Sequence, residues 1–419
     1  MTDLGWIETA VSAARPKAVS ALLRYFRDLD IAEEAFQEAC LRALGLWPQN
    51  GPPRDPCAWL IFVGRNAALD QVRRRSREAE LPDEAVLSDL DDAEDTLAER
   101  LDDAHYRDDI LRLLFICCHP DLSATQQVAL ALRIVSGLTV PQIARAFLVS
   151  ESAMEQRITR AKSRVAKAGA PFETPGPAER SERLAAVATM IYLVFNEGYS
   201  APSGEGGRAR LCDEAIRLVR LLLRLFPAEP EIMGLAALML LQHARLDARF
   251  DGDGAVILLD EQDRTRWNGA MIAEGLALID KAMRHRRPGP YLVQAAIAAL
   301  HARAERPEDT DWAQIDLLYA TLEHLQPSPV VTLNRAVAVS RNAGPAAALA
   351  MIEPLAGPLG GYFHYYGLRG ALLGDLGRRD EAREAYDRAI ALARTAAEAA
   401  HIRRHLDRLA EPGLPRAGG

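Results

Sequence analysis

One segment, residues 136–164, constrains the fold of this chain more than any other. Its sequence, SGLTVPQIARAFLVSESAMEQRITRAKSR, places apolar residues at helical spacing on both sides of a short break at 148–150. The apolar face of the first stretch and the inner seam of the second are formed by Val140, Ile143, Ala144 and Phe147, and by Met154, Ile158, Ala161 and Val165. This pattern predicts a helix-turn-helix, whose second helix can enter the major groove of DNA.

The second helix also carries a stripe of positive charge. Arg157, Arg160 and Arg164 recur at spacings of three and four residues, so they share one outward face. Such a stripe can neutralise phosphates and reach base edges. A charged face on an isolated helix is more often simply solvated, but the amphipathic helix upstream favours DNA binding here.

The net charge of −8 does not exclude a nucleic-acid partner, because the charges are segregated along the chain. Residues 81–104 hold ten acids against Arg100 alone, whereas residues 139–168 hold six bases against two acids. Basic residues are therefore concentrated where DNA would be bound, and the acidic segment is expected to be a linker.

Other classes of protein receive little support. No run approaches the roughly 20 apolar residues that a membrane span needs, and the N-terminus MTDLGWIETA does not resemble a secretion signal. The five cysteines form no CxxC pair, which favours a cytoplasmic protein with reduced thiols. We expect Cys117 and Cys118 to be buried rather than metal-bound, and DGDG at 251–254 to be a turn. Common nucleotide-binding and hydrolase motifs are missing, so we expect neither a cofactor nor enzymatic activity.

Helical periodicity dominates the whole chain and predicts an all-α protein in several parts. We expect a helical unit at 1–80, the acidic linker at 81–104, a second helical unit at 105–172 and a large third unit at 180–419. In the third unit a period of 34 residues is visible. The set Ala336, Val339, Ala348, Ile352 and Leu355 recurs as Gly370, Leu373, Ala382, Tyr386 and Ala389. Such a period predicts stacked helical hairpins with a concave face.

The first unit contains a helix with two contrasting faces. We expect Asp30 to cap its N-terminus, with Glu33 as the reciprocal capping residue. Small and aromatic residues are expected to pack inward, namely Ala32, Ala35, Phe36, Ala39 and Ala43. Outward lie Glu34, Gln37, Glu38 and Arg42, a mostly acidic stripe that suits a basic protein partner. A solvated face is the alternative.

The next helix, 58–77, follows the turn-rich segment 48–53. Core positions are expected at Ala58, Ile61, Phe62, Leu69 and Val72, and a neighbouring stripe holds Trp59, Asn66, Asp70, Arg73 and Arg77. An aromatic ring, an amide and arginines on one face could bind unstacked bases and a strand backbone. A buried, structural Trp59 is the more frequent alternative for so large a side chain.

These pieces in this order resemble a bacterial sigma factor of the extracytoplasmic-function (ECF) type. The resemblance lies in DIAEEAFQEACLRAL (30–44), PRDPCAWLIFVGRNAALDQVRRRSR (53–77) and LSATQQVALALRIVSGLTVPQIARAFLVSESAMEQRITRAKSRV (122–165), and covers about the first 40% of the chain. It implies docking on core RNA polymerase by Asp30, Glu33, Glu34, Gln37 and Glu38. It implies capture of the promoter −10 element by the loop 47–56 and by Trp59, Arg65, Asn66, Asp70, Arg73 and Arg74. The −35 duplex would be read by Ser152, Arg157, Arg160 and Arg164.

The third unit resembles tetratricopeptide (TPR) repeats, as in a subgroup of that family with an appended helical domain. Residues 367–393 show it best, and 291–325 fits a further repeat with an insertion near 305–310. We expect a regulatory or protein-binding module, with a rigid superhelix without a ligand as the alternative. Asn196 and Glu197, at the end of an expected helix, are candidates for a contact with the sigma part.

Two other classes of function remain possible on the sequence. One is a one-component regulator that couples a helix-turn-helix to a TPR sensor and binds DNA without polymerase. The other is a scaffold whose basic helix has no binding role. The helices at 30–42 and 59–77 favour the sigma factor, because neither alternative needs a polymerase-docking or a strand-opening helix.

Overall fold

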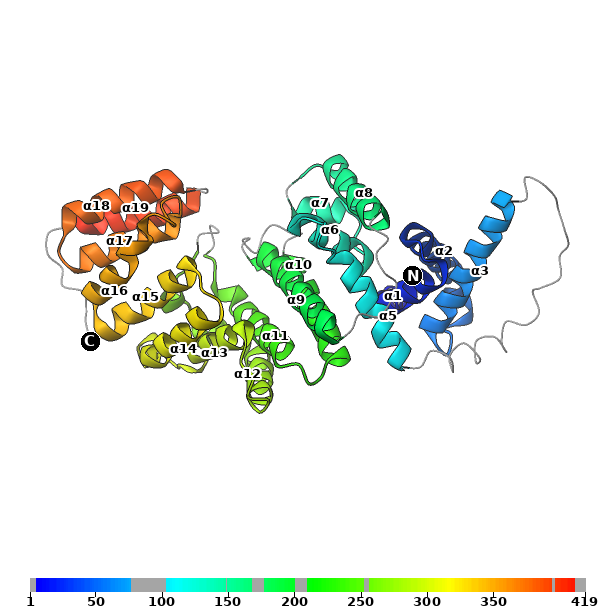
Figure 1. Ribbon diagram of the computed structural model, residues 1–419, viewed down its shortest axis with the longest axis horizontal. Helices are drawn as coiled ribbons and strands as arrows, with labels where there is room; N and C mark the ends of the chain where they lie inside the picture. The colour runs from blue at the N-terminus through cyan, green and yellow to red at the C-terminus, as the bar shows by residue number, and fades with distance from the viewer. Residues whose placement is uncertain are drawn as a thin grey trace. The chain divides into compact units, whose positions relative to one another are not determined.

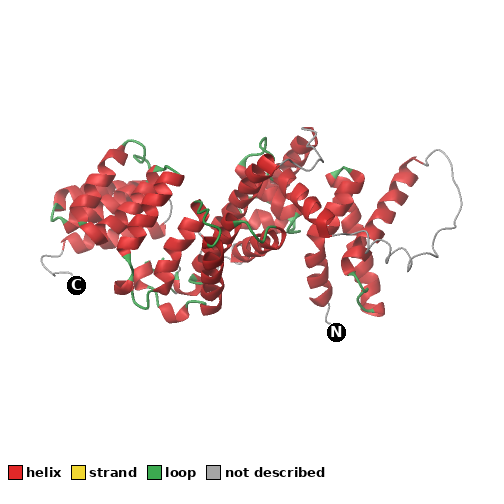
Figure 2. Ribbon diagram, turned by 60° about the horizontal axis from the view of Figure 1, so that its bottom comes forward, coloured by secondary structure: helices red, strands yellow, loops and turns green. Residues whose placement is uncertain are grey.

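The computed structural model describes residues 5–76, 103–147, 149–167, 177–199, 209–251, 256–393 and 396–410. In these ranges the regular elements are helices, as Figure 2 shows, and a lone bridge between Phe250 and Val256 is the one extended pairing. The prediction of an all-α protein is confirmed. Nearly all of the acidic linker predicted at 81–104 lies outside the described residues.

The described helices form two compact units, one reaching Leu218 and the other beginning at Val219, within a single helix. Figure 1 labels the elements along the chain. The first unit contains α1 (Gly5–Phe26), α2 (Leu29–Asn50), α3 (Pro56–Ser76), α5 (Asp103–Cys117), α6 (Ala124–Ile134), α7 (Val140–Ala146), α8 (Glu151–Lys167), α9 (Pro177–Tyr199) and most of α10 (Ala209–Leu225). No described helix is long and apolar enough to cross a membrane.

Helices α1, α2 and α3 pack against one another as an N-terminal bundle. The five inward positions predicted on α2 are all buried, at 1% exposure or less. Gly64 of α3 allows that helix to approach closely, because a Cβ there would lie 2.7 Å from the backbone oxygen of Ala35. The alanine-rich face of α2 is thus a surface for close helix packing.

Both ends of α2 differ from the sequence-based expectation. Asp28, not Asp30, caps the N-terminus, because its carboxylate accepts the backbone N–H groups of Asp30 and Ile31. At the other end the helix continues through Pro48 to Asn50, so the first part of the expected loop 47–56 is helical. It ends at Gly51, whose φ of 79° suits glycine and whose N–H bonds to the carbonyl of Trp47.

The second group of helices begins with α5, which packs on α1, and continues through α6, α7 and α8. Reciprocal capping boxes start α6 and α7, made by Ser123 with Gln126 and by Thr139 with Gln142. The two cysteines at the end of α5 are buried, as predicted, and burial raises the pKa of Cys118 to about 12. Among the described residues, no group of histidines, cysteines and carboxylates could hold a metal ion.

The second unit is a series of helical hairpins. Its α-helices are α11 (Pro230–His243), α12 (Gly269–Met283), α13 (Pro290–Arg303), α14 (Trp312–Leu325), α15 (Pro329–Ala343), α16 (Pro345–Ile352), α17 (Phe363–Asp375), α18 (Arg379–Leu392) and α19 (Ala396–Ala410). Proline occupies the first helical turn of α11, α13, α15 and α16, where its fixed φ favours helix initiation. The 3-10 turn Pro307–Asp309 occupies the insertion expected near 305–310.

The 34-residue period places small buried residues at Ala336 and Gly370, but not at the two preceding positions, Asn268 and Ala302. Gly234, Ala336 and Gly370 are buried and lie three periods and one period apart. A Cβ on Gly234 would meet the backbone nitrogen of Leu292 at 2.5 Å, and one on Gly370 would meet the Tyr386 ring at 2.6 Å. At both glycines, a larger residue would collide with the facing helix.

Candidate nucleic-acid interface

Helices α7 and α8 form the helix-turn-helix. The inner seam of α8 packs on α6 and α7. It consists of Met154, Ile158, Ala161 and Val165, which are all buried, as predicted. In the connection, Val149 donates its N–H to the carbonyl of Ala144, and the Ser150 hydroxyl accepts the N–H of Ala153 to cap α8. These bonds fix the second helix on the first and leave its opposite face exposed.

The residues predicted to read the −35 duplex occupy different environments on α8. Ser152 and Arg160 are exposed and Arg157 is half-buried. Arg164, although exposed, donates to the carbonyl of Asp121 at 3.0 Å and to Oε1 of Gln126 at 3.3 Å. Its side chain therefore also braces the loop that begins α6.

The residues predicted to capture the −10 element lie on α3. Trp59 is half-buried and packs edge-on against Trp47, with ring centroids 5.3 Å apart. Arg65 lies over the Tyr25 ring of α1 at 4.9 Å, on a different side of α3 from Trp59. Asn66 is half-buried and Asp70 is exposed, whereas the side chains of Arg73 and Arg74 lie outside the described residues.

The acidic side of α2 is split between two environments. Glu34 and Gln37 are exposed, and Glu38 pairs with Arg42 at 3.0 Å on the surface. Farther along the same stripe, Leu41 and Leu44 are 65% and 51% exposed, which the sequence analysis did not single out. An acidic patch continued by exposed leucines has the chemistry of a surface for a partner with basic and apolar groups.

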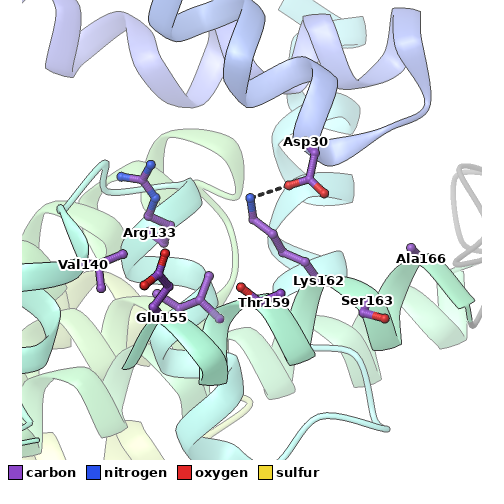
Figure 3. Close-up of a pocket in the computed structure, with 9 residues that line it drawn as sticks. Asp30, Arg133, Val140, Glu155, Thr159, Lys162, Ser163 and Ala166 are labelled. Carbon is purple, nitrogen blue, oxygen red and sulfur yellow. Dashed lines mark hydrogen bonds and ion pairs between the residues drawn. The ribbon is translucent and has the colours of Figure 1, made fainter. Parts of the chain in front are cut away.

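Glu33, grouped by sequence with these surface residues, is only 3% exposed. Its carboxylate lies 2.8 Å from Arg133 of α6, 2.8 Å from Lys162 of α8 and 3.5 Å from Arg15 of α1. Asp30 joins this group through a 2.6 Å bond from Lys162, shown in Figure 3. We call these five residues the Glu33 cluster.

Burial and ion pairing oppose each other within the Glu33 cluster. Burial would lower the pKa of Lys162, but its hydrogen bonds to Asp30 and Glu33 outweigh burial, and the net shift is upward. For Arg15 burial prevails and lowers the pKa, even though Glu33 acts in the opposite direction. Carboxylates hold both cations in place, and both cations lose hydration because they are buried.

Helical spacing could not have identified the Glu33 cluster, because Glu33 and its partners lie in separate parts of the chain. The positions of Arg133 and Lys162 are 100 and 129 residues from Glu33. A single clue was local: Arg15 sits in the apolar stretch of α1, where a buried arginine requires acceptors from elsewhere.

The geometry thus defines a helical DNA-binding protein with a helix-turn-helix attached to an N-terminal three-helix bundle. Residues 10–78 match Sigma-70 region 2, and residues 112–165 match Sigma-70, region 4. Residues 183–283 match a family of unknown function, DUF6596. An uncharacterized protein of Rhizobium meliloti (strain 1021) is 74% identical over 411 residues, which cover 98% of this chain and 97% of that protein. The chain thus carries regions 2 and 4 of the sigma-70 family, and these regions support a sigma factor that directs promoter recognition.

Proposed function

We propose that this protein is an ECF-type sigma factor that binds core RNA polymerase and directs initiation at promoters with −35 and −10 elements. Region 2 would dock through α2 and open DNA through α3, and region 4 would read DNA through α8. The factor would act in the cytoplasm, without a cofactor or chemistry of its own, and melting would draw its energy from base capture. The sequence-based domain limits, 1–80, 105–172 and 180–419, remain part of this proposal.

The observation that carries the proposal is the exposed stripe of α2 formed by Glu34, Gln37, Leu41 and Leu44. Two leucines that are half or more exposed are costly on a helix with a well-filled inner face, unless a partner covers them. A one-component regulator, the alternative function, needs no such surface, because it does not have to bind polymerase.

Binding to purified core polymerase tests this surface. Leu41→Glu is expected to weaken binding roughly tenfold or more, because a carboxylate would be buried against the partner. Leu317→Glu is the matched control, since Leu317 is 69% exposed on α14 of the second unit. Binding that survives Leu41→Glu, or that is lost equally in both variants, would contradict docking through α2.

Transcription from a promoter then separates the two candidate functions. With core enzyme, the full chain should yield promoter-specific transcripts, whereas the one-component regulator would bind duplex DNA and yield none. Arg160 is exposed on α8. Replacing it by alanine should remove about one phosphate contact, so that the affinity for −35 DNA falls and depends less steeply on salt concentration.

The C-terminal hairpins, on this proposal, form a TPR-like module that regulates the sigma regions or binds a protein or peptide. What supports it is the 34-residue spacing of the small buried residues Ala336 and Gly370, together with the series of helical hairpins. Asn196 and Glu197, in the last turn of α9, remain candidates for the contact with the sigma part. Unchanged promoter-dependent transcription after replacing both by alanine would remove that assignment.

A further inference from the structure

The Glu33 cluster joins region 2 to region 4 in a manner that the promoter-recognition function does not explain. Glu33 and Asp30 come from α2, whereas Arg133 and Lys162 come from α6 and α8. Arg133 and Lys162 keep only 21% and 18% of their side chains exposed. Cations are rarely buried to this degree unless they are paired, so the contact has specific geometry.

Arg15 of α1 makes a second set of hydrogen bonds between the two regions. Its guanidinium donates to the carbonyls of Ile134 and Arg133 at the end of α6, at 3.1 and 3.2 Å. The chain then turns at Gly137, whose φ is 75°. A Cβ at Gly137 would lie 2.7 Å from Cδ of Arg15, so glycine is required both by the turn and by the arginine.

The contact also brings α2 to the edge of the recognition helix. A pocket of about 300 Å³ separates them, lined by Asp30 on one side and by Glu155, Thr159 and Ser163 of α8 on another. Figure 3 shows the bond from Lys162 to Asp30, two of the residues that line this pocket. Ser152 lies on the same side of α8 by helical spacing, so this contact restricts access to part of the DNA-reading face.

We propose that the Glu33 cluster is a latch, which closes region 4 onto region 2 and must open before the protein docks on polymerase. The inference rests on the proposed function, because it takes α2 as the docking helix. Glu33 and Asp30 cannot bind the cations of region 4 and those of a polymerase surface together. The latch is suited to opening, since its groups are charged and regain hydration when the two regions separate.

Charge reversal at Lys162 tests the latch without touching the docking helix. Lys162→Glu places a carboxylate beside Asp30 and Glu33 and should open the contact. Spin labels on Gly45→Cys in α2 and Lys167→Cys in α8 report the distance between these helices, because both positions are exposed, and polymerase binding is measured on protein without these two cysteines. The native Cys40 and Cys57 should label slowly, since burial raises the pKa of their thiols to about 11 and about 12.

We expect Lys162→Glu to shift the label distances to longer values and to tighten binding to core polymerase by about tenfold, because the binding-competent form becomes the major one. Lys162→Gln should act in the same direction to a smaller extent, and circular dichroism checks that both variants fold. Arg145→Glu is the matched control, a charge reversal at an exposed residue of α7, and should change neither readout.

Three results overturn the latch. The first is an unchanged distance in both Lys162 variants. The second is a longer distance with no gain in polymerase affinity, while Leu41→Glu still weakens binding. That result would show that the closed contact does not hinder docking on polymerase, and it would leave the proposed function intact. The third is the absence of polymerase binding by every form of the protein, which refutes the proposed function and the latch with it.

Discussion

Helices distant in sequence meet in both compact units, but the contacts differ in kind. Where α2 meets α6 and α8, carboxylates and cations face one another beside a pocket of about 300 Å³. Where α11 meets α13, Gly234 brings the two backbones together, and the Glu231 carboxylate accepts the N–H groups of Tyr291 and Leu292.

The comparison indicates which contacts can open. Groups in the first contact are well hydrated when separated, so the cost of opening is small relative to unfolding. The second contact is closely packed, and separating it would expose apolar surface and leave a helix end without its acceptor. We therefore expect α6 and α8 to part from α2, with α5 still packed on α1, while the hairpins of the second unit stay together.

The largest expected effect comes from filling the close crossing of α11 and α13. Gly234→Ala should lower the free energy of unfolding of the second unit by about 3 kcal/mol, because the methyl group meets backbone atoms of Leu292 that cannot easily shift. Chemical denaturation combined with hydrogen exchange of α11 and α13 measures it. Gly269→Ala is the control, since a Cβ there meets nothing within 4 Å. Equal effects of the two substitutions would show that packing does not hold this crossing.

An acid-dependent loss of stability is also expected in the second unit. Burial, aided by the nearby charge of Arg245, lowers the pKa of His301 to about 4, despite the opposing effect of Asp260. From pH 6.5 down to about 4 the unfolded chain binds a proton that the folded chain does not, so stability falls as pH falls. His301→Gln should remove about 3 kcal/mol of this dependence.

Thermal unfolding across this pH range measures the contribution of His301. The matched control is His324→Gln, because His324 is exposed on α14. A pH profile that His301→Gln leaves unchanged would show that this histidine is protonated in the folded protein.

A smaller effect is expected from the start of the helix-turn-helix. Thr139→Ala removes the hydroxyl that accepts the N–H of Gln142, and should destabilise α7 by about 1 kcal/mol, because α7 has only seven residues. Thr139→Ser should restore the cap, and Thr9→Ala, at an exposed position of α1, should have little effect. Faster amide exchange in α7 with unchanged exchange in α11 is the expected observation.

The smallest effect is that of salt on the latch itself. Raising the salt concentration from about 0.1 M to about 1 M shortens the Debye length from about 10 to 3 Å and weakens attraction between charges. Because Glu33 is buried, we expect a shift toward the open form of less than about 1 kcal/mol, measured by the labels on α2 and α8. If exchange protection in α11 and α13 fell in parallel with the opening, the distinction between the two contacts would be lost.

The sequence by itself predicted those features that depend on local periodicity and local chemistry. Period 3.6 gave the buried seam of α8 and the inner face of α2, because a helix presents residues three and four apart to the same side. Period 34 predicted stacked hairpins in the C-terminal unit, and its small positions Ala336 and Gly370 are both buried. The identity of a capping residue was harder to predict, because several neighbouring residues can accept the same N–H groups. Asp28 caps α2, where Asp30 was expected.

Only the tertiary structure decided which charged residues are available on the surface. Glu33 and Glu34 are adjacent in sequence and chemically alike, yet one is buried among three cations and the other is exposed. Arg164 and Lys162 share a helix, yet one braces the start of α6 and the other pairs with α2. Charge pairing across more than a hundred residues leaves no periodic trace, because it depends on how separate helices are placed against each other.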